Sequence, residues 1–377
     1  MESLIVEEGK VQLGFLDSKA PPQSRVYTTI FAVHGMLFSG AVFKKLLPIC
    51  LESNIRLVVI NRRDYPGSTA LTEDELGVFS DTSESLEQNA RRVDFTRARG
   101  LELITFMDLF IQEHNLPPIS EVNGKKIGGV ALLGWSLGNA STMPAIAEIA
   151  NVSESTKVRL NAYLRTLIML EPALASLGMP PLPGGWVPTR DSPNISPSSA
   201  GPLLGMLVSA YYDHSPGAIS LDPQNQNRDP TKLEHVAPAL PSPGRPSVPT
   251  IYNMSPEDVA EIVRLPPRPV PRADLGLSRQ AALWKEVHHS YYYKACFSEE
   301  IRGKVLPGTN IVLIMGDRTV GTMVGALWQI WDDNAREMES RNISKPFVEF
   351  KLMNGANHFM HWDFPQKTVD ILKEILL

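Results

Sequence analysis

Residues Gly134–Gly138 combine a serine with a glycine two positions before it and another two positions after it. The pentapeptide reads Gly-Trp-Ser-Leu-Gly, follows an apolar run that is typical of a buried strand, and opens a helical stretch. A sharp strand-to-helix turn brings the residues on either side of its centre together, so both must be small. Such a turn holds the central side chain clear of the sheet, at the positive end of the helix. The spacing therefore predicts a strained turn that presents Ser136 as a nucleophile.

A serine hydroxyl is a poor nucleophile at neutral pH unless a base removes its proton. Histidine suits that task because its pKa lies near neutrality. The chain has eight histidines. His358 lies between the last expected strand and the last expected helix, and we predict that it is the base. His361, one helical turn further on, is the competing candidate, and we interpret it as a supporting or surface residue.

Strand and helix patterns alternate around these residues. Strands are expected as a hairpin over 4–16 that turns at 9–10, and at Val26–Val33, Ile55–Ile60, Ile127–Leu133, Leu164–Leu170, Asn310–Met315 and Phe347–Leu352. Helices are expected at Ala41–Glu52, at Ser83–Asn115 with a break near Gly100, from the serine turn to about Ala150, and at Thr322–Ser340 and Gln366–Leu377. The alternation predicts an α/β fold with a mostly parallel central sheet flanked by helices.

Prolines interrupt this alternation in the middle of the chain. The stretch from Pro172 to Pro271 holds 21 of the 31 prolines, and proline breaks both helices and strand ladders. Trp186, Tyr211, Tyr212 and Trp284 supply apolar anchors that a disordered linker would lack. We therefore expect a folded insertion over the upper edge of the sheet. Short helical pieces are expected within it at Pro202–Tyr212, Ser255–Arg264 and Ser278–Phe297.

The serine turn in its strand-and-helix context, together with His34-Gly35-Met36 and the Arg-rich loop Asn61–Ser68, resembles the α/β-hydrolase family. The resemblance runs from about Val26 to Leu377, except for the insertion. It implies an α/β-hydrolase core in two parts, 1–171 and 306–377, with a large proline-rich cap over 172–305.

The resemblance also implies roles for particular residues. The backbone amides of Met36 and Leu137 would hold a developing oxyanion, with His34 bracing the loop rather than reacting and Tyr65 as a wall of the pocket. The family usually has a glycine before its base, where this chain has Asn357.

The carboxylate partner of the histidine has two candidates. The family usually places an aspartate in a G-x-x-D loop after the next-to-last strand, but here that loop reads Gly316-Asp317-Arg318-Thr319. Asp317 lies in the loop two residues early. Glu171 ends the preceding strand, at the position from which haloalkane dehalogenases draw their acid. Both keep the chain order serine, acid, histidine. We prefer Glu171 because its longer side chain starts at the carboxyl end of a buried strand.

These residues predict a serine hydrolase that cleaves an ester or thioester through an acyl-enzyme. The alternatives are an acyltransferase or cyclase with the same machinery, and a catalytically inert ligand-binding protein. The proline-rich run over 178–186 and the triple tyrosine Tyr291–Tyr293 are similar to fungal α/β-hydrolases of secondary metabolism. That resemblance implies a small apolar substrate.

Composition bounds the other expectations. Apolar residues make up 43% and charged residues 20% of 377 residues, with a net charge of −5, which argues against a nucleic-acid binder. Two cysteines, Cys50 and Cys296, predict no disulfide framework and a reducing, cytoplasmic setting. The sequence shows no signal peptide and no apolar run long enough to span a membrane. It has no dinucleotide fingerprint and no zinc-ligand cluster, so we expect neither an organic cofactor nor a metal, and the partner that we expect is a small-molecule substrate, with the oligomeric state left open.

Overall fold

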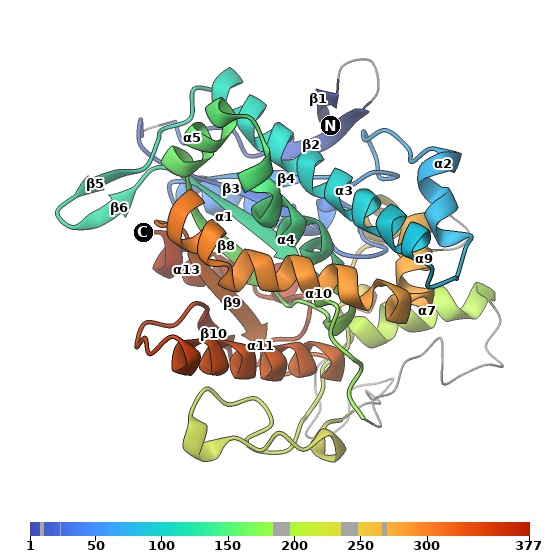
Figure 1. Ribbon diagram of the computed structural model, residues 1–377. Helices are drawn as coiled ribbons and strands as arrows, with labels where there is room; N and C mark the ends of the chain where they lie inside the picture. The colour runs from blue at the N-terminus through green and yellow to red at the C-terminus, as the bar shows by residue number, and fades with distance from the viewer. Residues whose placement is uncertain (8–10, 23, 184–196, 235–247, 266–269) are drawn as a thin grey trace.

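A central sheet lies between two layers of helices (Figure 1), in a computed structural model that describes residues 1–7, 11–22, 24–183, 197–234, 248–265 and 270–377. The strands, in order across the sheet, are β1 (Glu2–Glu7), β2 (Val11–Asp17), β4 (Ile55–Ile60), β3 (Thr28–Val33), β7 (Val130–Trp135), β8 (Leu164–Leu170), β9 (Asn310–Gly316) and β10 (Glu349–Met353). β2 pairs antiparallel with β1 and β4, and every other neighbouring pair in this sheet is parallel. The α/β class with a mostly parallel sheet is confirmed.

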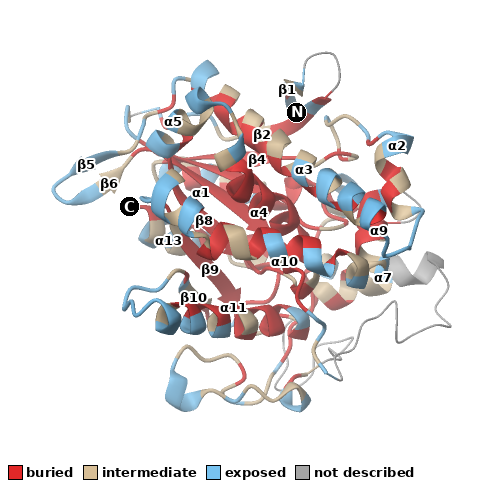
Figure 2. Ribbon diagram, viewed as in Figure 1, coloured by how far each residue is buried: buried red, intermediate tan, exposed pale blue. Residues whose placement is uncertain are grey.

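The central strands β3, β4, β7 and β8 are buried along their whole length (Figure 2). A parallel sheet has helices on both faces, so its strands must be apolar on both sides rather than alternating. That is why uninterrupted apolar runs identified these strands in the sequence. The turn of the β1–β2 hairpin, expected at 9–10, lies outside the described residues.

A second, two-stranded sheet was not expected from the sequence. β5 (Ser120–Val122) and β6 (Lys125–Ile127) pair antiparallel and are largely exposed. The turn between them is Asn123-Gly124, with φ of +53° and +75°, a pair of residues that favours a tight hairpin. Because β6 takes Ile127, the strand expected from Ile127 begins at Val130 instead.

The helices of the core form the two outer layers. They are α1 (Leu46–Glu52), α3 (Leu86–Glu113), α4 (Asn139–Glu148), α5 (Glu154–Tyr163), α11 (Gly321–Ser340), α12 (Met360–Asp363) and α13 (Pro365–Leu376). Side chains of α3, α4, α5 and α11 join one hydrophobic core, and those of α1, α12 and α13 join the other. The helix expected over 41–52 divides, with a 3₁₀ turn at Gly40–Phe43 before α1. Pro48 thus lies in the first turn of α1, where a missing N–H costs nothing.

The break expected near Gly100 is wrong, because α3 runs unbroken through it. A Cβ atom at Gly100 would lie 2.7 Å from the carbonyl carbon of Pro144 in α4. The glycine therefore serves a close approach between two helices rather than an interruption of one.

The stretch between β8 and β9 contains the helices α7 (Pro197–Val208), α8 (Pro256–Ile262), α9 (Arg272–Arg279) and α10 (Ala281–Phe297). Tyr211, Tyr212 and Trp284 are buried as expected, and Trp186 lies outside the described residues. α10 packs along α4 and α3 on one face of the sheet (Figure 1), so this last part of the stretch belongs to the helical layer. The segment before it reaches the loop after β3, where Phe38 forms an isolated β-bridge with Val263.

No helix in the described part of the chain has both the length and the apolarity needed to cross a membrane. Cys50 and Cys296 are both buried free thiols. Burial raises the pKa of each thiol to about 12, so neither is a thiolate at neutral pH.

Candidate active site

The predicted site residues gather at one edge of the sheet. Ser136 follows β7, Glu171 directly follows β8, and His358 follows β10. Met36 lies in the loop after β3. The carboxyl ends of parallel strands point to the same edge, which is where open α/β sheets place their ligand sites.

The turn between β7 and α4 holds Ser136 in a left-handed backbone conformation, with φ of +54°. A non-glycine residue there is strained, and such strain is commonly stored at functional sites. The two flanking positions, 134 and 138, have room only for glycine. A Cβ at Gly134 would lie 2.5 Å from Thr142 Oγ1, and one at Gly138 would lie 2.4 Å from the carbonyl oxygen of Val33. The spacing in the sequence thus reflects crowding on both sides of the serine.

Asn139, the first residue of α4, braces this turn and was not identified from the sequence. Its fully buried side-chain amide donates to the carbonyl oxygens of Gly134, at 3.0 Å, and Ser136, at 2.9 Å. The sequence did contain a feature that could have identified it, namely an asparagine three residues after the serine. Its short amide side chain can reach the backbone carbonyls of the turn, which have no partners within the helix.

His358 and Glu171 form a buried pair. The imidazole Nδ1–H donates to Glu171 Oε2 at 3.1 Å, and the two side chains are 3% and 0% exposed. The backbone of His358 is fixed as well, because its carbonyl oxygen accepts from Trp135 Nε1 at 3.0 Å. With Nδ1 donating to the carboxylate, Nε2 carries the free lone pair and can accept a proton.

Donors on the neighbouring loop hold the Glu171 carboxylate in place. Oε1 accepts from the backbone N–H of Gly316, and Oε2 accepts from the hydroxyl of Thr319. The backbone of Glu171 is itself left-handed, with φ of +49°, and its N–H donates to Ile314 at 2.9 Å. A buried carboxylate needs such donors, and here they also fix which oxygen faces the imidazole.

Asp317, the alternative acid, lies elsewhere in the structure. Its carboxylate accepts from the backbone N–H of Gly355 at 2.6 Å. This hydrogen bond joins the loop after β9 to the loop after β10. The structure therefore brings Glu171 to His358 and leaves Asp317 outside the pair.

The Ser136 hydroxyl has no hydrogen bond to any described residue, His358 included, and the serine is 9% exposed. Nucleophile–base hydrogen bonds are often long or open in the absence of substrate. Trp135, which directly precedes Ser136, contacts the base through its ring, whose centroid lies 5.0 Å from that of the His358 ring.

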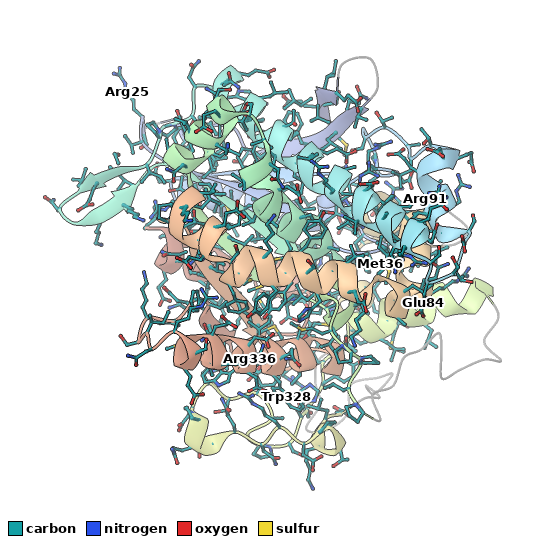
Figure 3. All side chains as sticks on the ribbon, in the orientation of Figure 1. Arg25, Met36, Glu84, Arg91, Trp328 and Arg336 are labelled. Carbon is teal, nitrogen blue, oxygen red and sulfur yellow. The ribbon has the colours of Figure 1, made fainter. Side chains whose placement is uncertain are left out.

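The loop after β3 passes directly beside the serine. A Cβ at Gly35 would lie 2.9 Å from the Cβ of Ser136, so only glycine allows the approach. Outside the helices and strands of the described residues, neither the amide of Met36 nor that of Leu137 donates to a backbone carbonyl. Met36 packs against an apolar cluster that includes Leu137, Leu277 and Trp284, near the end of α10 that meets α9 (Figure 3).

His34 is a fully buried brace. Its Nδ1–H donates to the carbonyl oxygen of Gly35 at 2.9 Å, and its Nε2 accepts from the backbone N–H of Arg62 at 3.1 Å. Burial, with the charge of Arg62 nearby, lowers the pKa of His34 well below its ordinary value. The ring is therefore neutral and already has a partner at each nitrogen.

His361 is a core residue rather than a surface one. It stacks on Phe43 at 4.6 Å and meets the Trp135 ring edge-on at 4.6 Å. Neither ring nitrogen has a hydrogen-bond partner in the described part of the chain. Burial, together with the nearby His358, lowers the pKa of His361 well below its ordinary value. Within the same residues, no group of three or more His, Cys, Asp or Glu side chains is placed to hold a metal ion.

Neither a protein-family model nor a curated protein sequence matches the chain. Solved structures of similar fold include an esterase from Exiguobacterium antarcticum, with 13% identity, a TM-score of 0.47, and 100% of this chain and 99% of that chain covered. A second is a carboxylesterase from Bacillus subtilis, with 12% identity, a TM-score of 0.46, and 98% of this chain and 90% of that chain covered. A third is the thioesterase domain from the curacin biosynthetic pathway, with 16% identity, a TM-score of 0.45, and 100% of this chain and 99% of that chain covered. Likenesses this distant say nothing about the chemistry of this chain.

The chain's own topology and site geometry carry the assignment. The sheet has an antiparallel second strand and a crossed strand order, β2-β4-β3-β7, in which every pair from β4 onward is parallel. Its strained Gly-x-Ser-x-Gly turn links a central strand to a helix, and the order along the chain is serine, carboxylate, histidine. The chain therefore has the α/β-hydrolase fold.

Proposed function

We propose that the protein is a serine hydrolase that cleaves an ester or thioester through an acyl-enzyme. Ser136 attacks the carbonyl carbon while Nε2 of His358 takes its proton, and Glu171 fixes the tautomer that makes this possible. The amides of Met36 and Leu137 receive the oxyanion. His358 then returns the proton to the leaving group, and a water molecule activated by the same imidazole releases the acyl group.

One observation carries the proposal: the buried Glu171–His358 pair lies at the same sheet edge as the strained turn at Ser136. A carboxylate with backbone and hydroxyl donors orients an imidazole whose second nitrogen is free. No purely structural role of Ser136 accounts for a left-handed backbone at a residue whose hydroxyl has no partner among the described residues.

The surroundings of the serine turn support a small apolar acyl group, such as that of a secondary metabolite. Leu137 and Ala140 pack with Leu277 of α9 and Trp284 of α10 in one apolar cluster. A cavity of about 40 Å³ lies beside this cluster; Phe95, Ala140 and Leu277 give it an apolar side, and its other lining residues include Arg62, Arg99 and Asp274. We propose that the insertion over 172–305 acts as a cap that selects the substrate through such contacts.

Contacts between the insertion and the loops of the site support the cap. Asn357, in place of the family's usual glycine, donates to the carbonyl oxygen of Ser209 and to the hydroxyl of Thr250, both at 2.8 Å. The backbone N–H of Arg264 donates to the carbonyl oxygen of Leu37 at 2.8 Å. The insertion thus contacts both the histidine loop and the oxyanion loop.

Labelling with a fluorophosphonate probe tests the nucleophile. We expect the probe to modify Ser136 alone, as mapped by peptide mass spectrometry, and Ser136→Ala to abolish labelling and ester turnover while the melting temperature stays close to that of the wild type. Ser141→Ala is the matched control, because Ser141 lies on α4 and is also 9% exposed. Labelling at another residue, or turnover by Ser136→Ala, would contradict the proposal.

Product analysis separates the hydrolase from an acyltransferase or cyclase, which would use the same residues. With a labelled ester and a panel of alcohols and amines, a hydrolase gives the free acid in every case. Acyl transfer or ring closure in preference to the free acid would reassign the reaction but keep the nucleophile. A wild-type protein that the probe does not label would indicate an inert ligand-binding protein.

A further inference from the structure

An ion pair links the insertion to the loop after β4. Asp274 of α9 accepts from the Arg62 guanidinium at 2.9 and 3.0 Å, and the two side chains are 1% and 13% exposed. Arg62 follows β4, whereas Asp274 lies 212 residues later in the chain. Burial acts to lower the pKa of Arg62, but the charge of Asp274 raises it above its ordinary value, so the guanidinium is charged. All of the side-chain hydrogen bonds of Arg62 start from Nη2, and its Nε has no partner among the described residues.

Arg62 uses the same side chain to hold the peptide group before Met36. Its guanidinium donates to the carbonyl oxygen of Gly35 at 2.9 Å, and His34 Nδ1 donates to that oxygen as well. In a planar trans peptide, the carbonyl of one residue and the N–H of the next point in opposite directions. Fixing the Gly35 carbonyl therefore fixes the direction of the Met36 N–H.

Asp274 holds the next peptide group. The backbone N–H of Leu37 donates to both Tyr65 Oη, at 2.9 Å, and Asp274 Oδ2, at 3.1 Å. The Tyr65 hydroxyl in turn donates to Asp274. Burial and the charge of Asp274 raise the pKa of Tyr65 well above its ordinary value, so the phenol keeps the proton it donates. Leu37 has a left-handed backbone, with φ of +65°, which needs such restraints.

We infer that Arg62 and Asp274 are positioning residues that aim the Met36 amide at the oxyanion, by clamping the peptide groups on both sides of Met36. The inference rests on the proposed function, in which that amide receives the oxyanion. It also gives the insertion a role in the chemical step, because Asp274 belongs to α9. Docking of α9 then completes the oxyanion hole, in addition to lining the pocket.

Asp274→Asn tests this clamp, because asparagine keeps an acceptor for Leu37 but loses the charge that holds Arg62. We expect kcat to fall by about 10- to 100-fold with KM changed by less than about 3-fold, as for a misaligned transition-state donor. Affinity for a trifluoromethyl ketone, which mimics the oxyanion, should fall in parallel with kcat. A purely structural role would lower the melting temperature without this split between kcat and KM.

A second variant keeps the test valid if Asp274→Asn does not fold. Arg62→Met combined with Asp274→Leu replaces the buried pair by apolar side chains of similar volume, a change that is often neutral for stability. It should fold and show the same loss of kcat. Glu73→Gln is the matched control, because Glu73 pairs with Arg272 of α9, the two side chains are 82% and 59% exposed, and neither forms a hydrogen bond to the loop after β3 among the described residues.

Hydrogen exchange of the peptide that spans Gly35–Phe38 separates this inference from the proposed function. Faster amide exchange in Asp274→Asn than in the wild type and Glu73→Gln would show that the clamp orders the loop, whether or not the protein turns over esters. Unchanged exchange, or unchanged kcat in an active enzyme, would overturn the inference. Faster exchange in a protein whose Ser136 is not labelled would instead overturn the proposed function, and with it the role of the clamp in catalysis.

Discussion

Thr319 donates its hydroxyl hydrogen to Oε2 of Glu171, the same carboxylate oxygen that lies 3.1 Å from His358 Nδ1. Position 319 is where the family's G-x-x-D loop would carry its aspartate. Glu171 follows β8 and Thr319 follows the adjacent β9, so two neighbouring strand ends converge on one point beside the imidazole. An acid that follows one strand and a hydrogen-bond donor that follows the next thus meet at one carboxylate oxygen.

The first prediction concerns the acid itself. Glu171→Gln should lower kcat by about 10³- to 10⁴-fold, because an amide can hold the imidazole in the wrong tautomer. Asp317→Asn should change kcat by less than about 10-fold, since the Asp317 carboxylate accepts from Gly355 and not from His358. Steady-state kinetics on one activated ester measures both. A larger loss in Asp317→Asn than in Glu171→Gln would return the acid to the loop after β9.

The second prediction moves the acid from one strand end to the other. In a Glu171→Gln background, Thr319→Asp should recover at least about 10-fold of the lost kcat, because its carboxylate starts next to the vacated position. Thr319→Asp alone should lower the melting temperature, since it buries a second carboxylate against Glu171. Thr319→Val in the Glu171→Gln background is the control and should recover nothing. Failure of the double variant, if it is folded, would mean that position 319 cannot reach the imidazole.

Much of the fold could be predicted because its signals are local. The strands Ile55–Ile60 and Leu164–Leu170 begin and end as expected, since a doubly covered parallel strand is an unbroken apolar run. Gly100 shows where local signals fail, because its meaning depends on Pro144 of another helix. The Asn123-Gly124 turn was a readable hairpin signal, but strands as short as β5 and β6 carry no periodicity to support it.

The residues of the candidate site also differ in whether a local feature of the sequence identifies them. Ser136 and its glycines form one local motif, and Glu171 could be proposed because a strand end fixes where its side chain starts. Asp274 could not be found, because it lies 237 residues from the Leu37 amide that it accepts from, and nothing in a charged residue on a short helix indicates its partner. Tyr65, expected as a pocket wall, contacts the oxyanion loop through its hydroxyl.

The third prediction separates the two histidines near the C-terminus. His358→Ala should remove most of the activity, by about 10³-fold or more, because the base is lost. His361→Leu should fold with a free energy of unfolding no lower than that of the wild type at neutral pH. Leucine has a similar volume and removes two buried nitrogens that lack partners in the described part of the chain. Reversed effects on turnover would place the base one helical turn later.

The fourth prediction is the pH dependence of stability that His361 confers. Its pKa in the folded protein lies well below the ordinary value of 6.5. As the pH falls below that value, the unfolded chain binds a proton that the folded protein does not. The free energy of unfolding should therefore fall, by up to about 1.4 kcal/mol per pH unit for this group. Urea unfolding at about pH 7.5 and about pH 5.5 should show a smaller loss for His361→Leu than for the wild type. Equal losses would mean that His361 takes up its proton without unfolding.

The last prediction concerns how the insertion selects the substrate. Leu277 of α9 belongs to the same apolar cluster as Leu137, the residue after Ser136, and lines the cavity of about 40 Å³ beside α4. Leu277→Ala removes three carbon atoms from that wall and should raise kcat/KM for longer acyl chains relative to short ones, by about 10-fold across a series of p-nitrophenyl esters. A few methylene groups in an apolar pocket are worth a discrimination of this order.

Short activated esters should still react with Leu277→Ala, because neither the nucleophile nor its base lies in the insertion. Leu275→Ala is the matched control, since Leu275 is on the same helix but joins neither the apolar cluster nor the cavity wall. If Leu277→Ala and Leu275→Ala shift the chain-length preference equally, or neither shifts it, the acyl group does not contact this face of α9. The selectivity of the insertion would then have to come from another of its segments.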